Sequence, residues 1–411
     1  MQQKIFKFLL QFIALLALID RVFAKWYHKI MENNENLVIL ENTPTQNQTT
    51  IKTELKPKKQ RDAGFEILRI IAMILIVCVH FLNYGGFIEN AKSETELALL
   101  RVLFSVFLVS VNVFVLISAY FSVKSKFKWQ RLLKLWVDVV IYSILFYLAN
   151  LLLTNSAFDL KTFIFLFFPV INKNFWFFTA YFALSLIAPF LNKALNTCSK
   201  KEFYFLLVLV AIVSYSSLRL RLDEILLTNT GYSLIWFICL YIVGAFFRLY
   251  PIKENKWLIA FIYLTSTALI FANFYLSTDI PLYTYIHMPA EYTCPLVLIA
   301  SICIFLLFKD IKFKSVKINN AIRFVSKSAF IVYLFDGSYL RDWLYFSFLK
   351  IQNYYGNIYS VLIVIAFALS VFLMAFAIDL VKRGIEKLIT VIITKVKDKK
   401  GKNNEQLSST T

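Results

Sequence analysis

The chain has 411 residues, of which 59% are hydrophobic, and its mean hydropathy is +0.66. A soluble fold of this length cannot bury so much apolar surface, so the composition excludes a soluble globular protein and predicts an all-α, polytopic membrane helix bundle. The formal net charge is +19, but Lys and Arg lie in short clusters between apolar runs, which indicates membrane topology and excludes a nucleic-acid partner.

The first 60 residues differ from the rest of the chain. We expect 1–60 to form a leader and a disordered cytoplasmic tail, because 31–60 is polar and low in hydrophobicity. The apolar run at 5–24 is compatible with a signal-like segment, an additional span or an interfacial anchor. A fourth interpretation is an over-extended start, since Met31 begins the polar stretch.

A transmembrane region follows at 61–381. A span needs about 20 mostly apolar residues, and on that rule we predict about ten transmembrane helices. They cover 65–84, 98–121, 132–153, 175–192, 203–218, 232–249, 256–276, 291–308, 322–346 and 358–381.

The charges between these stretches predict how the bundle is oriented. Every second loop is basic, as the positive-inside rule requires of cytoplasmic loops. Examples are Lys253 and Lys256 after the sixth stretch and Lys309 and Lys312 after the eighth. The alternate loops are mainly acidic, with one exception after the fifth stretch. We therefore expect a multi-pass protein of the cell membrane with both termini in the cytoplasm.

Two further segments are predicted not to cross the bilayer. The stretch 157–172 is apolar but short, and Pro169 and Asn172 close it, so we expect an outer, interfacial or re-entrant helix. At 382–411, apolar residues recur at helical spacing opposite several Lys residues. This pattern predicts an amphipathic cytoplasmic tail that lies on the inner leaflet.

The first predicted span contains two ionisable residues, Arg69 and His80. Eleven helical residues return to within about 20° of the same direction and rise about 16 Å, so both side chains should face one groove. Ionisable groups at membrane depth generally face the bundle interior or a water-filled cavity, which makes both residues functional candidates. In the alternative interpretation Arg69 pairs with Glu66 near the membrane boundary and His80 hydrogen-bonds a neighbouring helix.

The sequence around these residues resembles that of a known family. FEILRIIAMILIVCVHF is similar to the first-span signature of the acyltransferase-3 family, in which a basic residue is followed by ten residues and then His. Five later segments resemble that family in the same order, over roughly 61–385: NVFVLISAYFSVKSKF, FKWQRLLKLW, NFWFFTAYFALSLIAPFLNKAL, GYSLIWFICLYIVGAFFR and SAFIVYLFDGSYLRDWLY. Two departures stand out. Ala119 replaces a usual Gly, and Phe335 and Asp336 stand where a second His often follows Tyr-Leu.

The resemblance implies that 61–381 is a transmembrane acyltransferase domain. Such a domain would move an acetyl or other acyl group from acyl-CoA, most simply acetyl-CoA, to a hydroxyl of a sugar on a cell-surface or lipid-linked polysaccharide. An imidazole can accept and return a proton near neutral pH, so His80 is expected to act as the base or to carry the acyl group, with Arg69 as the second catalytic residue. Arg131 and Lys134 are expected to bind the donor phosphates.

Four other residues are candidates for substrate binding. Glu66 is expected to orient Arg69, although a simple ion pair on the helix surface is an equal alternative. Trp176 and Tyr181, together with Trp236, are expected to line an acceptor groove, although aromatic belts at the membrane interface also account for such residues.

The competing functional class is a transporter or flippase for a lipid-linked saccharide. Many transporters contain repeated halves, and no internal repeat is visible in this sequence. The five cysteines lack metal-ligand spacing, so we expect no metal site. The expected partners are the lipid bilayer, acyl-CoA and a saccharide acceptor, and a homo-oligomer is left open.

Overall fold

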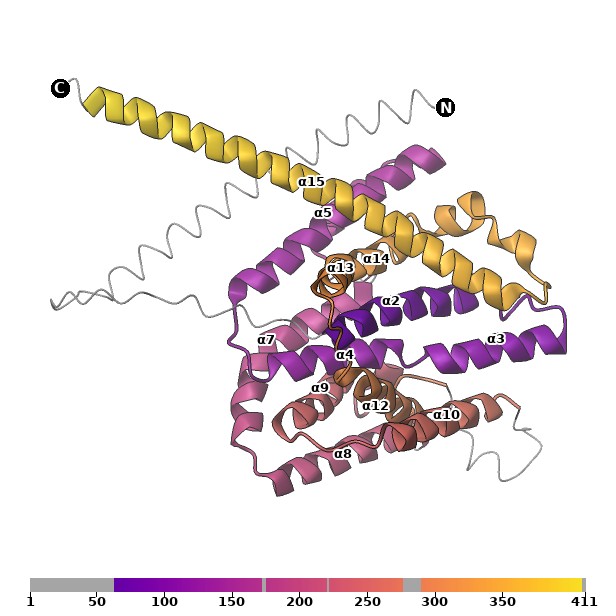
Figure 1. The fold of residues 1–411 in the computed structure, drawn as a ribbon. Coiled ribbons are helices and arrows are strands. Elements are labelled where there is room, and N and C mark those ends of the chain that lie inside the picture. The colour runs from indigo at the N-terminus through magenta and orange to yellow at the C-terminus, as the bar shows by residue number, and fades with distance from the viewer. Residues whose placement is uncertain (1–62, 172–174, 220–221, 276–289, 409–411) are drawn as a thin grey trace. The chain divides into compact units, whose positions relative to one another are not determined.

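The computed structural model describes residues 63–171, 175–219, 222–275 and 290–408, and every regular element within these ranges is a helix (Figure 1). The predicted all-α class is confirmed. The predicted leader and tail at 1–60 lie outside the described residues. Contacts divide the chain into two compact units, one of residues 61–376 and a second that takes in 377–411. The functional candidates all lie in the first unit.

Five helical segments of the described chain are long and apolar enough to cross a membrane. They are α2 (Ala63–Asn83), the segment Glu94–Ser122 formed by α3 (Glu94–Phe107) and α4 (Ser110–Ser122), α5 (Trp129–Thr154), α7 (Trp176–Thr197), and Ser360–Leu388 of α15 (Ser360–Ser408). Shorter helices lie at four other predicted spans: α8 (Lys200–Arg219), α9 (Leu234–Leu249), α10 (Lys256–Ala272) and α12 (Pro295–Lys309). The chain is thus a polytopic helical membrane protein, and the number of ten crossings stays a prediction.

The helices of the first unit expose large apolar side chains, as a protein solvated by lipid does. Phe190 of α7, Phe205 of α8 and Phe261 of α10 are 75%, 63% and 65% exposed. In water these residues would form a costly apolar surface, whereas lipid chains solvate them well.

The prediction of one continuous span at 322–346 is wrong. The structure has α13 (Val316–Ser326), α14 (Ala329–Asp336) and a π-helical turn, η3 (Trp343–Phe348). The first break falls at Lys327 and Ser328, directly after Ser326, and the second begins at Gly337. Serine hydroxyls compete for backbone hydrogen bonds and glycine is a poor helix former, so polar and small residues interrupt the apolar run where the helix ends.

The segment predicted not to span contains only a short helix, α6 (Leu160–Phe165). Asp159 caps it, because its carboxylate accepts hydrogen bonds from the hydroxyl and the backbone N–H of Thr162 and from the N–H of Lys161. These bonds hold the pKa of Asp159 below its usual range. Six residues rise about 9 Å, which is far too short for a membrane crossing. The second predicted non-spanning segment, 382–411, is continuous with α15 up to Ser408.

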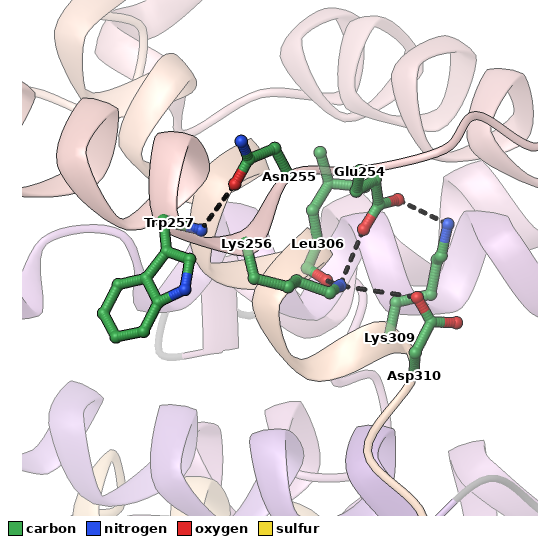
Figure 2. Close-up of polar contacts among 7 residues, drawn as sticks. All are labelled: Glu254, Asn255, Lys256, Trp257, Leu306, Lys309 and Asp310. Atoms are coloured by element: carbon green, nitrogen blue, oxygen red, sulfur yellow. Dashed lines mark hydrogen bonds and ion pairs between the residues drawn. The ribbon is translucent and has the colours of Figure 1, made fainter.

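A buried carboxylate joins the ends of α10 and α12 (Figure 2). The Glu254 side chain is 2% exposed and pairs with Lys256 Nζ at 2.7 Å and with Lys309 Nζ at 2.5 Å. Lys256 also donates to the Leu306 carbonyl at 2.6 Å, whereas Trp257 points away and is 87% exposed. Lys256 and Lys309 follow the sixth and eighth predicted spans, and the charge pattern places both on one side of the membrane. The structure brings these two lysines together at Glu254.

Helix α4 packs against α2, α9 and α12 (Figure 1). The contact with α9 depends on Gly244, where an added Cβ would lie 2.6 Å from the Leu116 carbonyl oxygen and 2.7 Å from the Cβ of Ala119. Small residues at such crossings allow two membrane helices to approach closely. Ala119, the position where the family usually has Gly, is therefore one side of a tight helix contact.

We expect Gly244→Ala to destabilise the protein. A Gly to Ala substitution inside a helix normally raises the free energy of unfolding by about 0.5–1 kcal/mol. Overpacking a tight contact lowers it by about 1–3 kcal/mol. The measurement is the unfolding midpoint of the purified protein in detergent. Gly384→Ala in α15 is the matched control, because nothing lies within 4 Å of a Cβ there. Equal stability of the Gly244→Ala protein and the control would contradict the tight α4–α9 contact.

Candidate active site

A cavity of about 580 Å³ lies inside the first unit. One face of α2 lines it with Glu66, Arg69, Met73, Ile76 and His80, which recur three or four residues apart. The face extends over roughly 21 Å, because each helical residue rises about 1.5 Å. The structure thus places Arg69 and His80 in one cavity, and the cavity has the size of small-molecule sites.

The cavity has two chemically different ends. We call one end the basic end: Glu66 contacts Arg69 and Ser326 there, Lys327 follows Ser326 in the chain, and Arg131 also lines the cavity. The histidine end is formed by His80, Trp176 and Tyr292. Apolar residues of α4, α7 and α14 lie between them. Charge is therefore concentrated at one end and the imidazole lies at the other.

A buried carboxylate holds His80. Nδ1 of His80 hydrogen-bonds Oδ2 of Asp336, which is the last residue of α14 and is fully buried. The hydroxyl of Tyr345 in η3 donates to the other oxygen, Oδ1, at 2.6 Å. Since a carboxylate accepts, the hydrogen bond assigns the ring hydrogen to Nδ1 and leaves Nε2 of a neutral imidazole able to take a proton. A base oriented by a third group is a recurrent arrangement in proton-transfer catalysis.

At the basic end, Glu66 is 3% exposed and accepts from Arg69 Nη1 at 2.7 Å and from Ser326 Oγ at 2.5 Å. The Arg69 guanidinium also lies 5.6 Å from the ring centroid of Phe121 in α4. The ion pair of the alternative interpretation is therefore present, and it faces the cavity. That Glu66 orients Arg69 for catalysis stays a prediction.

Within the described residues, no group of three or more His, Cys, Asp or Glu side chains could hold a metal ion.

Comparison with known families gives a clear match. The acyltransferase-3 family, described as an acyltransferase domain, matches residues 62–379. The chain belongs to the acyltransferase-3 family. No curated protein and no solved structure matched.

This membership makes the chain a membrane acyltransferase, and the structure shows which candidates share the cavity. Arg131, Trp176 and Tyr181 line it together with the α2 residues. Arg131 and Tyr181 also line an adjoining cavity of about 200 Å³, beside Lys126 and Lys128. The two cavities meet at the start of α5.

Two predicted residues of this acyltransferase lie elsewhere. Lys134 is exposed and lines neither of these two cavities. Trp236, expected to line an acceptor groove, is fully buried, and its Nε1 donates to Asn112 Oδ1 at 3.0 Å. Its role in the structure is to hold Asn112, so the expected contact with a groove is wrong.

Sequence reasoning missed Asp336 and Lys327. Asp336 is an acidic residue inside the apolar run FIVYLFDG, so the argument that selected Arg69 and His80 at membrane depth applies to it equally. Lys327 had no such signal, because it reaches the cavity only through the break between α13 and α14.

We expect Glu66→Gln to lower stability by about 1–2 kcal/mol. It removes the charge that neutralises Arg69, and breaking a buried pair costs about 3–5 kcal/mol, reduced here because the Arg69 side chain is 23% exposed. Unfolding of the purified protein in detergent measures the change. The control Glu386→Gln breaks an α15 pair with Lys382 whose carboxylate is 39% exposed, so a change below about 0.5 kcal/mol is expected. Equal effects of both variants would rule out a special role of the Glu66 pair.

Proposed function

We propose that this membrane acyltransferase transfers an acyl group, most simply acetyl, from acyl-CoA to a hydroxyl of a sugar on a cell-surface or lipid-linked polysaccharide. One observation carries the proposal. His80, oriented by buried Asp336, lines the same cavity as the basic side chains Arg69, Arg131 and Lys327.

His80 performs the proton transfers in this mechanism. The donor supplies an acyl group activated as a thioester. Nε2 of His80 takes the proton of the sugar hydroxyl as its oxygen bonds to the thioester carbonyl carbon. When the carbon–sulfur bond breaks, His80 returns the proton to the departing thiolate. Asp336 stabilises the imidazolium that exists between the two steps, and Tyr345 keeps the carboxylate in place.

The basic end binds the phosphates of the donor in this proposal. Glu66 neutralises Arg69, so Arg131 and Lys327 supply the additional positive charge that phosphates require. Arg69 and His80 are eleven residues apart on α2, about 16 Å along the axis, so the donor must be a long molecule with its phosphates far from its reacting carbonyl. Acyl-CoA has this form. With the orientation expected from the loop charges, the basic end faces the cytoplasm, where acyl-CoA is made.

The direct test uses purified protein, labelled acetyl-CoA and a panel of glycan acceptors. The proposal expects label on a glycan. Saccharide movement across a vesicle membrane without modification would instead favour the flippase. A glycan acylated from a donor other than acyl-CoA would keep the acyltransferase and overturn the donor assignment.

We expect variants of the His80 pair to lose activity in a graded order. His80→Ala should reduce the transfer rate by about 10²–10⁴-fold, the usual contribution of a general base. Asp336→Asn should reduce it by about 10–100-fold, because the amide cannot stabilise the imidazolium. Asp342→Asn is the control, since that carboxylate is 78% exposed. Wild-type transfer rates in correctly inserted His80→Ala protein would end the base assignment.

For the donor-binding residues we expect a change in KM. Lys327→Ala and Arg131→Ala should each raise the KM for acetyl-CoA by about tenfold, because each removes a charge-assisted hydrogen bond to phosphate. Lys134→Ala, one turn from Arg131 on α5 but outside both cavities, should leave the KM unchanged. Steady-state kinetics with labelled acetyl-CoA measure this. A larger effect of Lys134→Ala than of Lys327→Ala would refute the assignment.

A further inference from the structure

Three aromatic rings at the histidine end of the cavity contact one another. The ring centroid of Trp176 lies 4.4 Å from that of Tyr232 and 6.2 Å from that of Tyr292, and the two tyrosine rings are 5.3 Å apart. Trp176 and Tyr292 line the cavity, and Tyr232 is 40% exposed beside them. We call these three residues the aromatic platform.

The platform is not an aromatic belt facing lipid. Belt residues place their rings at the lipid surface, whereas Tyr292 is 6% exposed and lines the cavity. Its carbonyl accepts a hydrogen bond from Asn112 Nδ2 at 2.9 Å, and Asn112 is held in turn by Trp236. Gly231 has φ +105°, and a Cβ there would lie 2.5 Å from Tyr292 Cβ. The backbone segments that carry Tyr232 and Tyr292 therefore pack closely against each other.

The rings are too close together to enclose a cation. A group between two ring faces needs about 3.5 Å on each side, or about 7 Å between the rings. The centroid distances are 4.4–6.2 Å, so the rings fill the space between them. What they offer is a continuous apolar surface.

One carboxylate oxygen without a hydrogen-bond partner belongs to the residue that precedes Tyr292. Oε2 of Glu291, the residue before Tyr292, is buried and accepts no hydrogen bond. A buried acceptor without a donor is unfavourable, and a ligand hydroxyl would satisfy it. An apolar lipid chain on the platform would leave the carboxylate unsatisfied.

We infer that the aromatic platform and Glu291 form a subsite for a neutral sugar ring of the acceptor. The C–H face of a pyranose packs on an aromatic surface, and its hydroxyl donates to the carboxylate. Tyr84 lies near both parts of the site: its ring is 5.3 Å from that of His80, and it interacts electrostatically with Tyr232 and Tyr292. This inference rests on the proposed function, in which a sugar hydroxyl must reach His80. It names the residues that select the acceptor.

The test measures sugar binding separately from acyl transfer. The protein is placed in lipid nanodiscs free of sugar detergents, and maltotriose and chitotriose are used as neutral probes in saturation-transfer NMR. Both wild type and His80→Ala should bind a probe, because the subsite does not require the base. Binding of a probe by wild-type protein that transfers no acyl group would leave the subsite intact and count only against the proposed reaction.

Single substitutions then locate the subsite. Trp176→Leu and Tyr232→Leu should each weaken binding at least about tenfold, and Glu291→Gln should weaken it about tenfold through loss of a hydrogen bond to a charged acceptor. The controls are Trp257→Leu, whose indole is 87% exposed on α10, and Glu224→Gln, which is exposed. The controls should bind as wild type does. Failure of wild type to bind either sugar, or unchanged binding in both platform variants, would overturn the inference.

Discussion

The structure depends on one hydrogen-bonded pair, the imidazole of His80 and the buried carboxylate of Asp336. An isolated carboxylate in a membrane protein interior is costly, and it persists only where hydrogen bonds and an ionisable partner satisfy it. Nδ1 of His80 and the Tyr345 hydroxyl supply those bonds, one to each oxygen. Tyr345 is fixed in turn by stacking on Phe81, one residue after His80, at 4.2 Å between ring centroids. The pair therefore requires α2, the end of α14 and η3 to meet at one point.

This requirement explains why the chain does not form a simple span at 322–346. Ser326 contacts Glu66 and Asp336 contacts His80, so α14 runs in the same direction as α2 between the two ends of the cavity. The break before α14 presents Lys327 at the basic end, and the break after it lets η3 turn back toward Asp336. Both interruptions therefore coincide with side chains of the candidate site. A continuous helix would have formed more backbone hydrogen bonds, but it could not have placed side chains at both ends of the cavity.

Local periodicity was enough to predict the α2 side of the site. The spacing of Arg69 and His80 fixes their common direction, and the order of the family motifs adds Arg131, Trp176 and Tyr181, all of which line the cavity. Contacts between distant segments were not predictable in this way. His80 and Asp336 are separated by 256 positions, and Lys327 depends on a helix break. The roles of the aromatic residues could not be predicted, because Trp176 and Trp236 look alike in the sequence. Only their packing shows that one lines the cavity and that the other is a buried support.

The charges along the cavity give it a direction. At one end Glu66 offsets Arg69, and Arg131 and Lys327 add positive charge. At the other end Asp336 hydrogen-bonds His80, and Glu291 adds an acceptor beside the aromatic platform. Such a gradient favours a ligand with anionic groups at the basic end and hydroxyl donors at the histidine end. In the proposed reaction, two substrates with these opposite preferences would meet beside His80, and this charge distribution would bring the thioester and the hydroxyl together.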